Sequence, residues 1–101
     1  MIVNFKTKKL EKCYCQSSQA KKEFGDQVAR KYIHRVNLIK AAKNLDEVML
    51  LPGLGCHALK GNRHGQYTVK LTGFYRLIFT VADGDCLNIA LIEEVSKHYD
   101  D

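Results

Sequence analysis

The sequence lacks the features that mark membrane, secreted or disulfide-bonded proteins. No apolar run approaches the roughly 20 residues that a membrane-spanning helix needs, and the stretch MIVNFKTKKL is not a basic start followed by an apolar segment, as a secretory signal would be. The four cysteines form neither a CxxC pair nor the framework of a secreted disulfide-rich protein; they are Cys13, Cys15, Cys56 and Cys86. We therefore expect a cytoplasmic protein with reduced thiols and no contact with membranes.

Familiar catalytic and metal-binding motifs are also missing. No serine or cysteine lies in a recognisable nucleophile motif, and no metal-binding triad is visible. A zinc site can be assembled from Cys13, Cys15, Cys56 and His57, but this spacing is not one of the familiar zinc patterns. Partly buried, reduced thiols are the preferred interpretation, and we expect neither a metal nor a cofactor.

Positive charge is concentrated in the first half of the chain. Residues 1–43 contain eleven Lys or Arg and three Asp or Glu, whereas residues 83–101 contain one basic and six acidic side chains. A basic half on a small protein indicates a polyanionic or acidic partner. A solvated, lysine-rich helix surface is the alternative that charge alone leaves open. The basic residues considered for binding in this half are Lys21, Lys22, Arg30 and Lys31.

The apolar pattern predicts one α+β domain over residues 1–101, with an N-terminal strand and helices packed on a small, largely antiparallel sheet. A strand is expected at 1–5 and helices at 7–16, 17–25 and 26–43, with Thr7 and then Ser17 or Ser18 as N-caps and Gly25 as a stop. A helical turn at 45–51 precedes Pro52, the only proline. Strict alternation then predicts strands at 66–72, 74–81 and 86–95, the last two joined by a hairpin.

Several ionisable side chains follow or face these strands. Arg76 is expected on the face opposite the apolar residues of its strand, where it either binds a phosphate or covers apolar surface and pairs with Glu93 or Glu94. His57 and Lys60 precede the strands, and His98 and Tyr99 follow the last one. An imidazole, ammonium, guanidinium and phenol without a nucleophile suit acid/base catalysis with charge stabilisation. RNA fits such a set, because its 2′-hydroxyl supplies the nucleophile.

The segment HALKGNRHGQYTVKLTGFYRLIF resembles the signature of HigB-type toxins, a branch of the RelE/ParE toxin superfamily. The matching elements are His57, the Leu59-Lys60-Gly61 segment, Arg63, Gly65, Tyr67 and the run from Tyr75 to Phe79. The resemblance implies a RelE-like fold and a metal-independent endoribonuclease that cuts messenger RNA in the ribosomal A site. It also implies a cognate antitoxin, through which alone the toxin would contact operator DNA.

The same resemblance implies roles for particular residues. The catalytic set would be His57, Lys60, Arg76, His98 and Tyr99. The residues expected from their positive charge to bind messenger or ribosomal RNA are Lys21, Lys22, Arg30, Lys31, Arg63 and Lys70. The family branch often ends its last strand with Asp-Tyr-His, whereas this chain ends SKHYDD, so the order of histidine and tyrosine is reversed. A ParE-type gyrase inhibitor is the second hypothesis, because it shares the fold without cutting RNA, and a non-catalytic RNA- or protein-binding module is the third.

Overall fold

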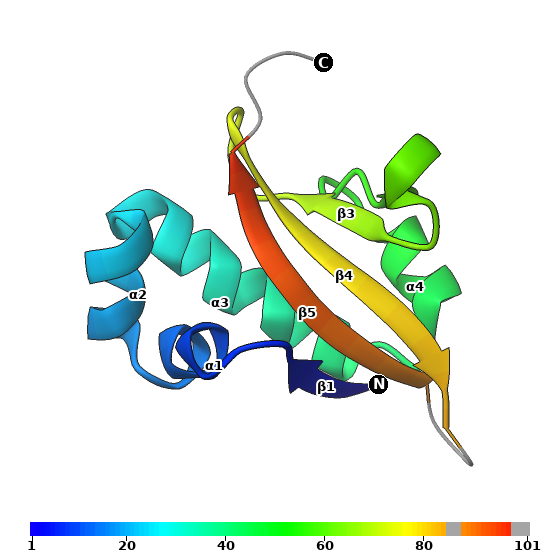
Figure 1. The fold of residues 1–101 in the computed structure, drawn as a ribbon, viewed down its shortest axis with the longest axis horizontal. Coiled ribbons are helices and arrows are strands. Elements are labelled where there is room, and N and C mark those ends of the chain that lie inside the picture. Colours follow the sequence, from blue (N-terminus) through cyan, green and yellow to red (C-terminus); the bar gives the residue numbers. More distant parts are fainter. Residues whose placement is uncertain (85–87, 98–101) are drawn as a thin grey trace.

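The computed structural model describes residues 1–84 and 88–97, and Figure 1 shows helices gathered on one face of a twisted sheet. The strands are β1 (Ile2–Phe5), β2 (His57–Ala58), β3 (Tyr67–Lys70), β4 (Tyr75–Asp83) and β5 (Asn88–Lys97). The helices are α1 (Lys8–Cys15), α2 (Ser17–Phe24), α3 (Asp26–Ala41), α4 (Leu45–Leu50) and the short 3₁₀ helix η1 (Gly61–Arg63). The α+β class expected from the sequence is confirmed. Within the described residues, no helix is both long and apolar enough to cross a membrane.

The sheet has the strand order β1-β5-β4-β3-β2. Strands β2 to β5 pair antiparallel with their neighbours, and β1 lies parallel to β5 at the opposite edge from β2. The register of β4 and β5 continues to the pair Asp83 and Asn88, as a hairpin requires. The long central hairpin therefore carries both the core of the sheet and the residues of its open face.

The helix layer is built on α3. Its apolar positions Val28, Tyr32, Val36 and Ile39 recur at helical spacing and are buried, while Ile33 is half-buried. This stripe belongs to the same core as the buried strand residues, which are Val69, Leu77, Phe79, Ala90 and Ile92. The face of the sheet that packs against α3 is therefore buried, and a functional site has to lie on the opposite face.

The helix boundaries correct two expectations. Thr7 caps α1 as expected, because its hydroxyl accepts the Leu10 amide at 3.1 Å. The expected serine cap of α2 is wrong: Gln16 occupies the cap position without a side-chain hydrogen bond, since the helix already begins at Ser17. Helix α3 ends at Ala41 rather than Lys43, and Asn44 caps α4 by accepting the Glu47 amide at 3.0 Å.

Arg35 is buried, whereas Arg30, Lys31 and Lys40 of the same helix are exposed. Its side chain is only 9% exposed, and its Nε donates to the carbonyl oxygen of Lys70 at 3.1 Å. A guanidinium buried among apolar groups needs such a partner. Arg35 therefore ties α3 to the end of β3 and fixes the strand that carries Thr68 and Lys70.

A β-bulge in the central hairpin changes which side chains of β5 reach the open face. Phe79 is paired with Ile92, but the preceding residue, Ile78, is paired with Glu94, so Glu93 is an extra residue in β5. Because side chains alternate along a strand, one extra residue exchanges the two faces beyond it. Glu94 and Ser96 consequently join Ile78 and Arg76 on the face away from α3.

Candidate active site

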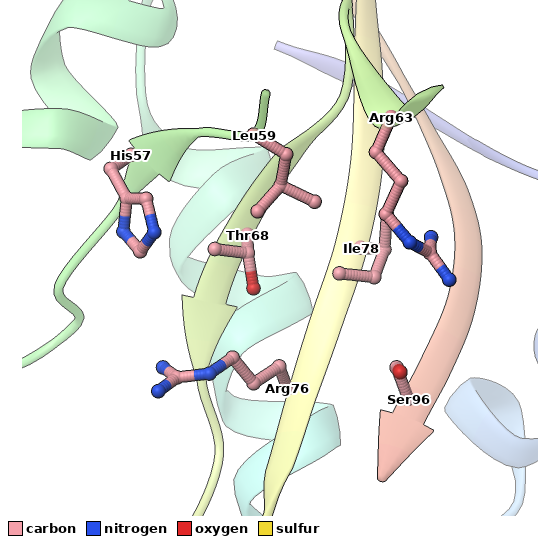
Figure 2. Close-up of a pocket in the computed structure, with 7 residues that line it drawn as sticks. All are labelled: His57, Leu59, Arg63, Thr68, Arg76, Ile78 and Ser96. Atoms are coloured by element: carbon pink, nitrogen blue, oxygen red, sulfur yellow. The ribbon is translucent and has the colours of Figure 1, made fainter. Parts of the chain in front are cut away.

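A pocket of about 440 Å³ opens on the helix-free face of the sheet. The lining side chains come from β2, β3, β4 and β5, from η1 and from Leu59 just after β2, and Figure 2 shows how they lie around this space. The lining residues are His57, Leu59, Arg63, Thr68, Arg76, Ile78 and Ser96. The pocket thus combines an imidazole, two guanidinium groups and two hydroxyls with an apolar floor.

The strand register arranges these side chains in two rows. In the first row, His57 pairs with Thr68, Thr68 with Ile78, and Ile78 with Glu94. In the second row, Lys70 pairs with Arg76 and Arg76 with Ser96. Neighbouring strands lie about 4.8 Å apart, and alternate residues of one strand about 6.6–6.8 Å apart. The second row therefore concentrates positive charge beside the imidazole at the end of the first row.

His57 is exposed on the edge strand β2, and its ring orientation is set by the backbone. Its Nδ1 lies 2.9 Å from the carbonyl oxygen of Gly55. A carbonyl oxygen can only accept, so Nδ1 carries the proton and the neutral ring keeps its lone pair on Nε2. His57 is thereby prepared to accept a proton at Nε2, or to donate one there when it is charged.

Arg63 closes the pocket from the loop between β2 and β3. Its Nη1 donates to Oε1 of Gln66 at 2.9 Å, and its Nη2 lies 3.3 Å from Oε1 of Glu94. The loop can turn tightly here because Gly61 and Gly65 adopt positive φ angles of 69° and 94°. The Glu94 side chain is 45% exposed, so the pair is weak in water and open to exchange with another anion.

Arg76 and Lys70 supply the positive charge of the second row. Arg76 is half-buried and lines the pocket, while Lys70 is exposed on the adjoining strand. Of the nearby carboxylates, Glu93 lies 3.2 Å from Nζ of Lys6 and Glu94 binds Arg63. The planar guanidinium of Arg76 at the pocket wall suits a phosphate group.

Other expected site residues lie outside the pocket lining. Lys60 is exposed at the position just before η1. His98 and Tyr99, the remaining members of the expected catalytic set, lie outside the described residues. The structure therefore brings together His57, Arg63 and Arg76, with Lys70 on the same face.

The basic residues of α2 and α3 lie in the helix layer, whereas the pocket opens on the helix-free face of the sheet (Figure 1). Lys21 and Lys22 are exposed on α2, and Arg30 and Lys31 are exposed on α3. The carboxylate of Asp26 lies 3.7 Å from Lys21 and 3.4 Å from Arg30. These four side chains do not line the pocket, and their positive charge can hold a long polyanion against the helix layer.

The cysteines do not form a metal centre in residues 1–84 and 88–97, where no group of three or more His, Cys, Asp and Glu side chains is placed to hold an ion. Cys13 is buried, Cys15 is exposed and Cys56 is half-buried, all as free thiols. Burial raises the pKa of Cys56 to about 11, and burial also raises the pKa of Cys13. Both thiols stay protonated near neutral pH, which makes them poor ligands and nucleophiles.

Sequence reasoning missed three polar residues of this face. Thr68 was expected on the polar side of β3, yet it is completely buried beneath the pocket. Ser96 was not assigned to the site, and Glu94 was considered only as a partner of Arg76, because alternation from Ala90 and Ile92 places both on the core face when the bulge is not known. The alternating pattern around Val69 already indicates that Thr68 lies on the face opposite the core. The positions of Ser96 and Glu94 follow only from the pairing of β5 with β4.

A model of HigB-like toxins, described as the RelE-like toxin of the type II toxin-antitoxin system HigB, matches residues 3–93. The fold resembles a YoeB/ParE toxin from Agrobacterium tumefaciens, with 20% identity, a TM-score of 0.63, and 98% of this chain and 100% of the other covered. It also resembles the YoeB dimer from Staphylococcus aureus, with 18% identity, a TM-score of 0.64 and 98% of each chain covered.

A further solved structure, YafQ from E. coli strain BL21(DE3), has 17% identity and a TM-score of 0.58, with 94% of this chain and 90% of the other covered. No curated protein matches the chain. At these identities the structural likeness establishes the fold, whereas activity has to be argued from the site itself.

Proposed function

The chain belongs to the HigB-like family of RelE-like toxins of type II toxin-antitoxin systems, and from this premise we propose that it is a ribosome-dependent endoribonuclease that cuts messenger RNA in the A site. The observation that carries the proposal is the convergence of His57 and Arg76. They are 19 positions apart in the sequence and lie on different strands, yet both line one pocket. A proton-transfer group beside a phosphate-binding group is what RNA cleavage by its own 2′-hydroxyl requires.

The proposed reaction uses only protein groups. A base takes the proton of the 2′-hydroxyl, and the 2′-oxygen forms a bond to the adjacent phosphorus. The bond from phosphorus to the 5′-oxygen breaks, and an acid protonates that oxygen, so the products are a 2′,3′-cyclic phosphate and a free 5′-hydroxyl. Nε2 of His57 suits one of the two proton transfers, because its lone pair is directed away from the Gly55 carbonyl. His98 remains the candidate for the other, and Tyr99 for positioning the substrate.

The positively charged side chains on the helix-free face of the sheet would stabilise the negative charge that develops during the reaction. Arg76 would bind the non-bridging oxygens of the scissile phosphate, where negative charge grows in the transition state. Lys70, its neighbour in the second row, would bind an adjoining phosphate, and Lys60 could reach the substrate from the loop. Arg63 would exchange Glu94 for RNA, while the basic residues of α2 and α3 would hold ribosomal RNA. The protein would act in the cytoplasm, under the control of a cognate antitoxin protein.

The test is to express the toxin alone and map transcript ends, then to repeat this with His57→Gln and Arg76→Ala. The matched control is His64→Gln, which changes a histidine outside the pocket lining. We expect both pocket variants to relieve growth arrest and to lose cleavage at least 100-fold, because each removes a group that acts in the transition state. Unchanged Tm values would show that the folds are intact.

The alternative activities give different results in the same experiment. Full toxicity of both pocket variants would refute the ribonuclease. Intact transcripts together with DNA breaks would instead support a gyrase-directed toxin of the ParE type. Growth arrest without cleavage of RNA or DNA would support a binding module.

A further inference from the structure

Thr68 carries a polar group that the fold itself does not satisfy. The residue is fully buried, and its Oγ1 has no hydrogen-bond partner among the residues that the structure describes. A buried hydroxyl without a partner destabilises the folded protein, and native structures contain few of them. The hydrophobic core does not require this hydroxyl either, because Thr68 faces away from α3, on the side of the pocket.

The surroundings of Thr68 identify the kind of group that its hydroxyl faces. Its direct cross-strand neighbours on the pocket face are His57 and Ile78, and Arg76 is two residues from Ile78 on the same face. Figure 2 shows the hydroxyl oxygen pointing into the space bounded by these three side chains. A hydroxyl donor beside a guanidinium can bind the same ligand as the guanidinium. A phosphate suits both groups, because it has enough oxygens to accept a hydrogen bond from each.

We propose that Thr68 is a further substrate-binding residue, whose hydroxyl donates to a phosphoryl oxygen of the RNA phosphate held by Arg76. The proposal deepens the ribonuclease function and rests on it. In the free protein the hydroxyl is covered within the pocket, with the side chains of Leu59 and Arg76 beside it in Figure 2. Both are side chains with rotatable bonds, so substrate can reach the oxygen when they shift. The hydrogen bond forms only in the complex, which explains why the free fold retains an unsatisfied group.

The decisive variant is Thr68→Val, which keeps the shape of the side chain and removes the hydroxyl. Cleavage is measured on purified ribosomes stalled with a defined codon in the A site. We expect a maximal rate lower by roughly 10–100-fold and a concentration of ribosome complex at half-maximal rate higher by at most about 10-fold, because the lost bond is present with bound RNA and strengthens as charge grows on the phosphate. Thr68→Ser should retain most of the rate. The Tm of Thr68→Val should rise by about 4–8 °C, because an unsatisfied buried group is removed.

The matched control is Thr80→Val on the neighbouring strand. The hydroxyl of Thr80 donates to Glu93 at 3.0 Å, so its loss should lower the Tm and leave cleavage unchanged. A purely structural role for Thr68 predicts the opposite pattern for Thr68→Val, with a lower Tm and a loss of activity that follows it. Wild-type cleavage by Thr68→Val would overturn the inference while leaving the ribonuclease intact.

A binding measurement separates the failure of this inference from the failure of the proposed function. A single-stranded 2′-O-methyl RNA oligonucleotide keeps its phosphates but cannot be cleaved. We expect it to raise the Tm of the wild-type protein more than that of Thr68→Val. If the wild-type protein cleaves no RNA, this difference still supports a phosphate contact in the pocket, and equal Tm shifts overturn it.

Discussion

Tyr32→Phe removes one buried hydrogen bond that joins two helices, and its effect on stability can be worked out from the structure. Tyr32 of α3 is fully buried, and its hydroxyl donates to the carbonyl oxygen of Leu10 in α1 at 2.7 Å. That carbonyl lies inside a helix and keeps its helical amide partner after the substitution. The loss should therefore be near the typical value for one hydrogen bond, about 1 kcal/mol, or roughly 4–8 °C in Tm.

The same substitution has a distinct pH dependence. Burial raises the pKa of Tyr32 above its ordinary value of about 10, so the folded protein favours the neutral hydroxyl. The stability that this group contributes is complete below pH 10 and is lost as the pH rises above it. Each pH unit above 10 removes up to about 1.4 kcal/mol from the wild-type protein but not from Tyr32→Phe. The free energy of unfolding of the wild-type protein, about 1 kcal/mol above that of Tyr32→Phe at neutral pH, should therefore equal it near pH 11.

Urea denaturation followed by circular dichroism between pH 7 and pH 11 measures both effects. Tyr14→Phe is the matched control, because the Tyr14 hydroxyl donates to Oδ1 of Asn37 in an exposed position. We expect this control to lose at most a few tenths of a kcal/mol at pH 7, where water replaces the bond. If Tyr32→Phe is as stable as the wild-type protein at pH 7, or if the difference persists unchanged at pH 11, the reasoning is wrong.

Three further predictions concern the pocket rim, the thiols and the basic surface. A double-mutant cycle with Arg63→Glu and Glu94→Arg should give a coupling energy of about 0.2–1 kcal/mol in urea denaturation, because both side chains are more than 40% exposed; zero coupling would contradict the observed pair. At pH 8, a thiol reagent should modify the exposed Cys15 at least about 10 times faster than Cys56, because burial raises the pKa of Cys56 to about 11. Peptide mapping measures both rates, and equal rates would contradict the burial of Cys56. Neutralising the basic residues of α2 and α3 should weaken sedimentation with ribosomes at low salt and flatten its salt dependence; an unaltered salt dependence would assign that charge to solubility. The residues to be changed together are Lys21, Lys22, Arg30 and Lys31.

Much of the fold followed from local patterns. Helical spacing from Val28 to Ile39 and strict alternation from Tyr67 to Leu71 predicted the correct elements, because burial of one face imposes a period on the sequence. Helix ends were less accurate, as Gln16 and Ala41 show. Capping depends on a few local hydrogen bonds, so tertiary packing can move a boundary by one or two residues.

The sequence by itself determined the fold class, the basic first half and the chemical nature of His57 and Arg76 as site candidates. Only the tertiary structure decided which groups share the pocket. Pairing of β2 with β3 places His57 beside Thr68, and the bulge at Glu93 transfers Glu94 and Ser96 to the face of Arg76. The physical reason is that side chains change face at every residue, so one inserted residue reverses the assignment beyond it. The apolar pattern along β5 does not reveal where such an extra residue lies, because the bulge is defined by the pairing of β5 with β4.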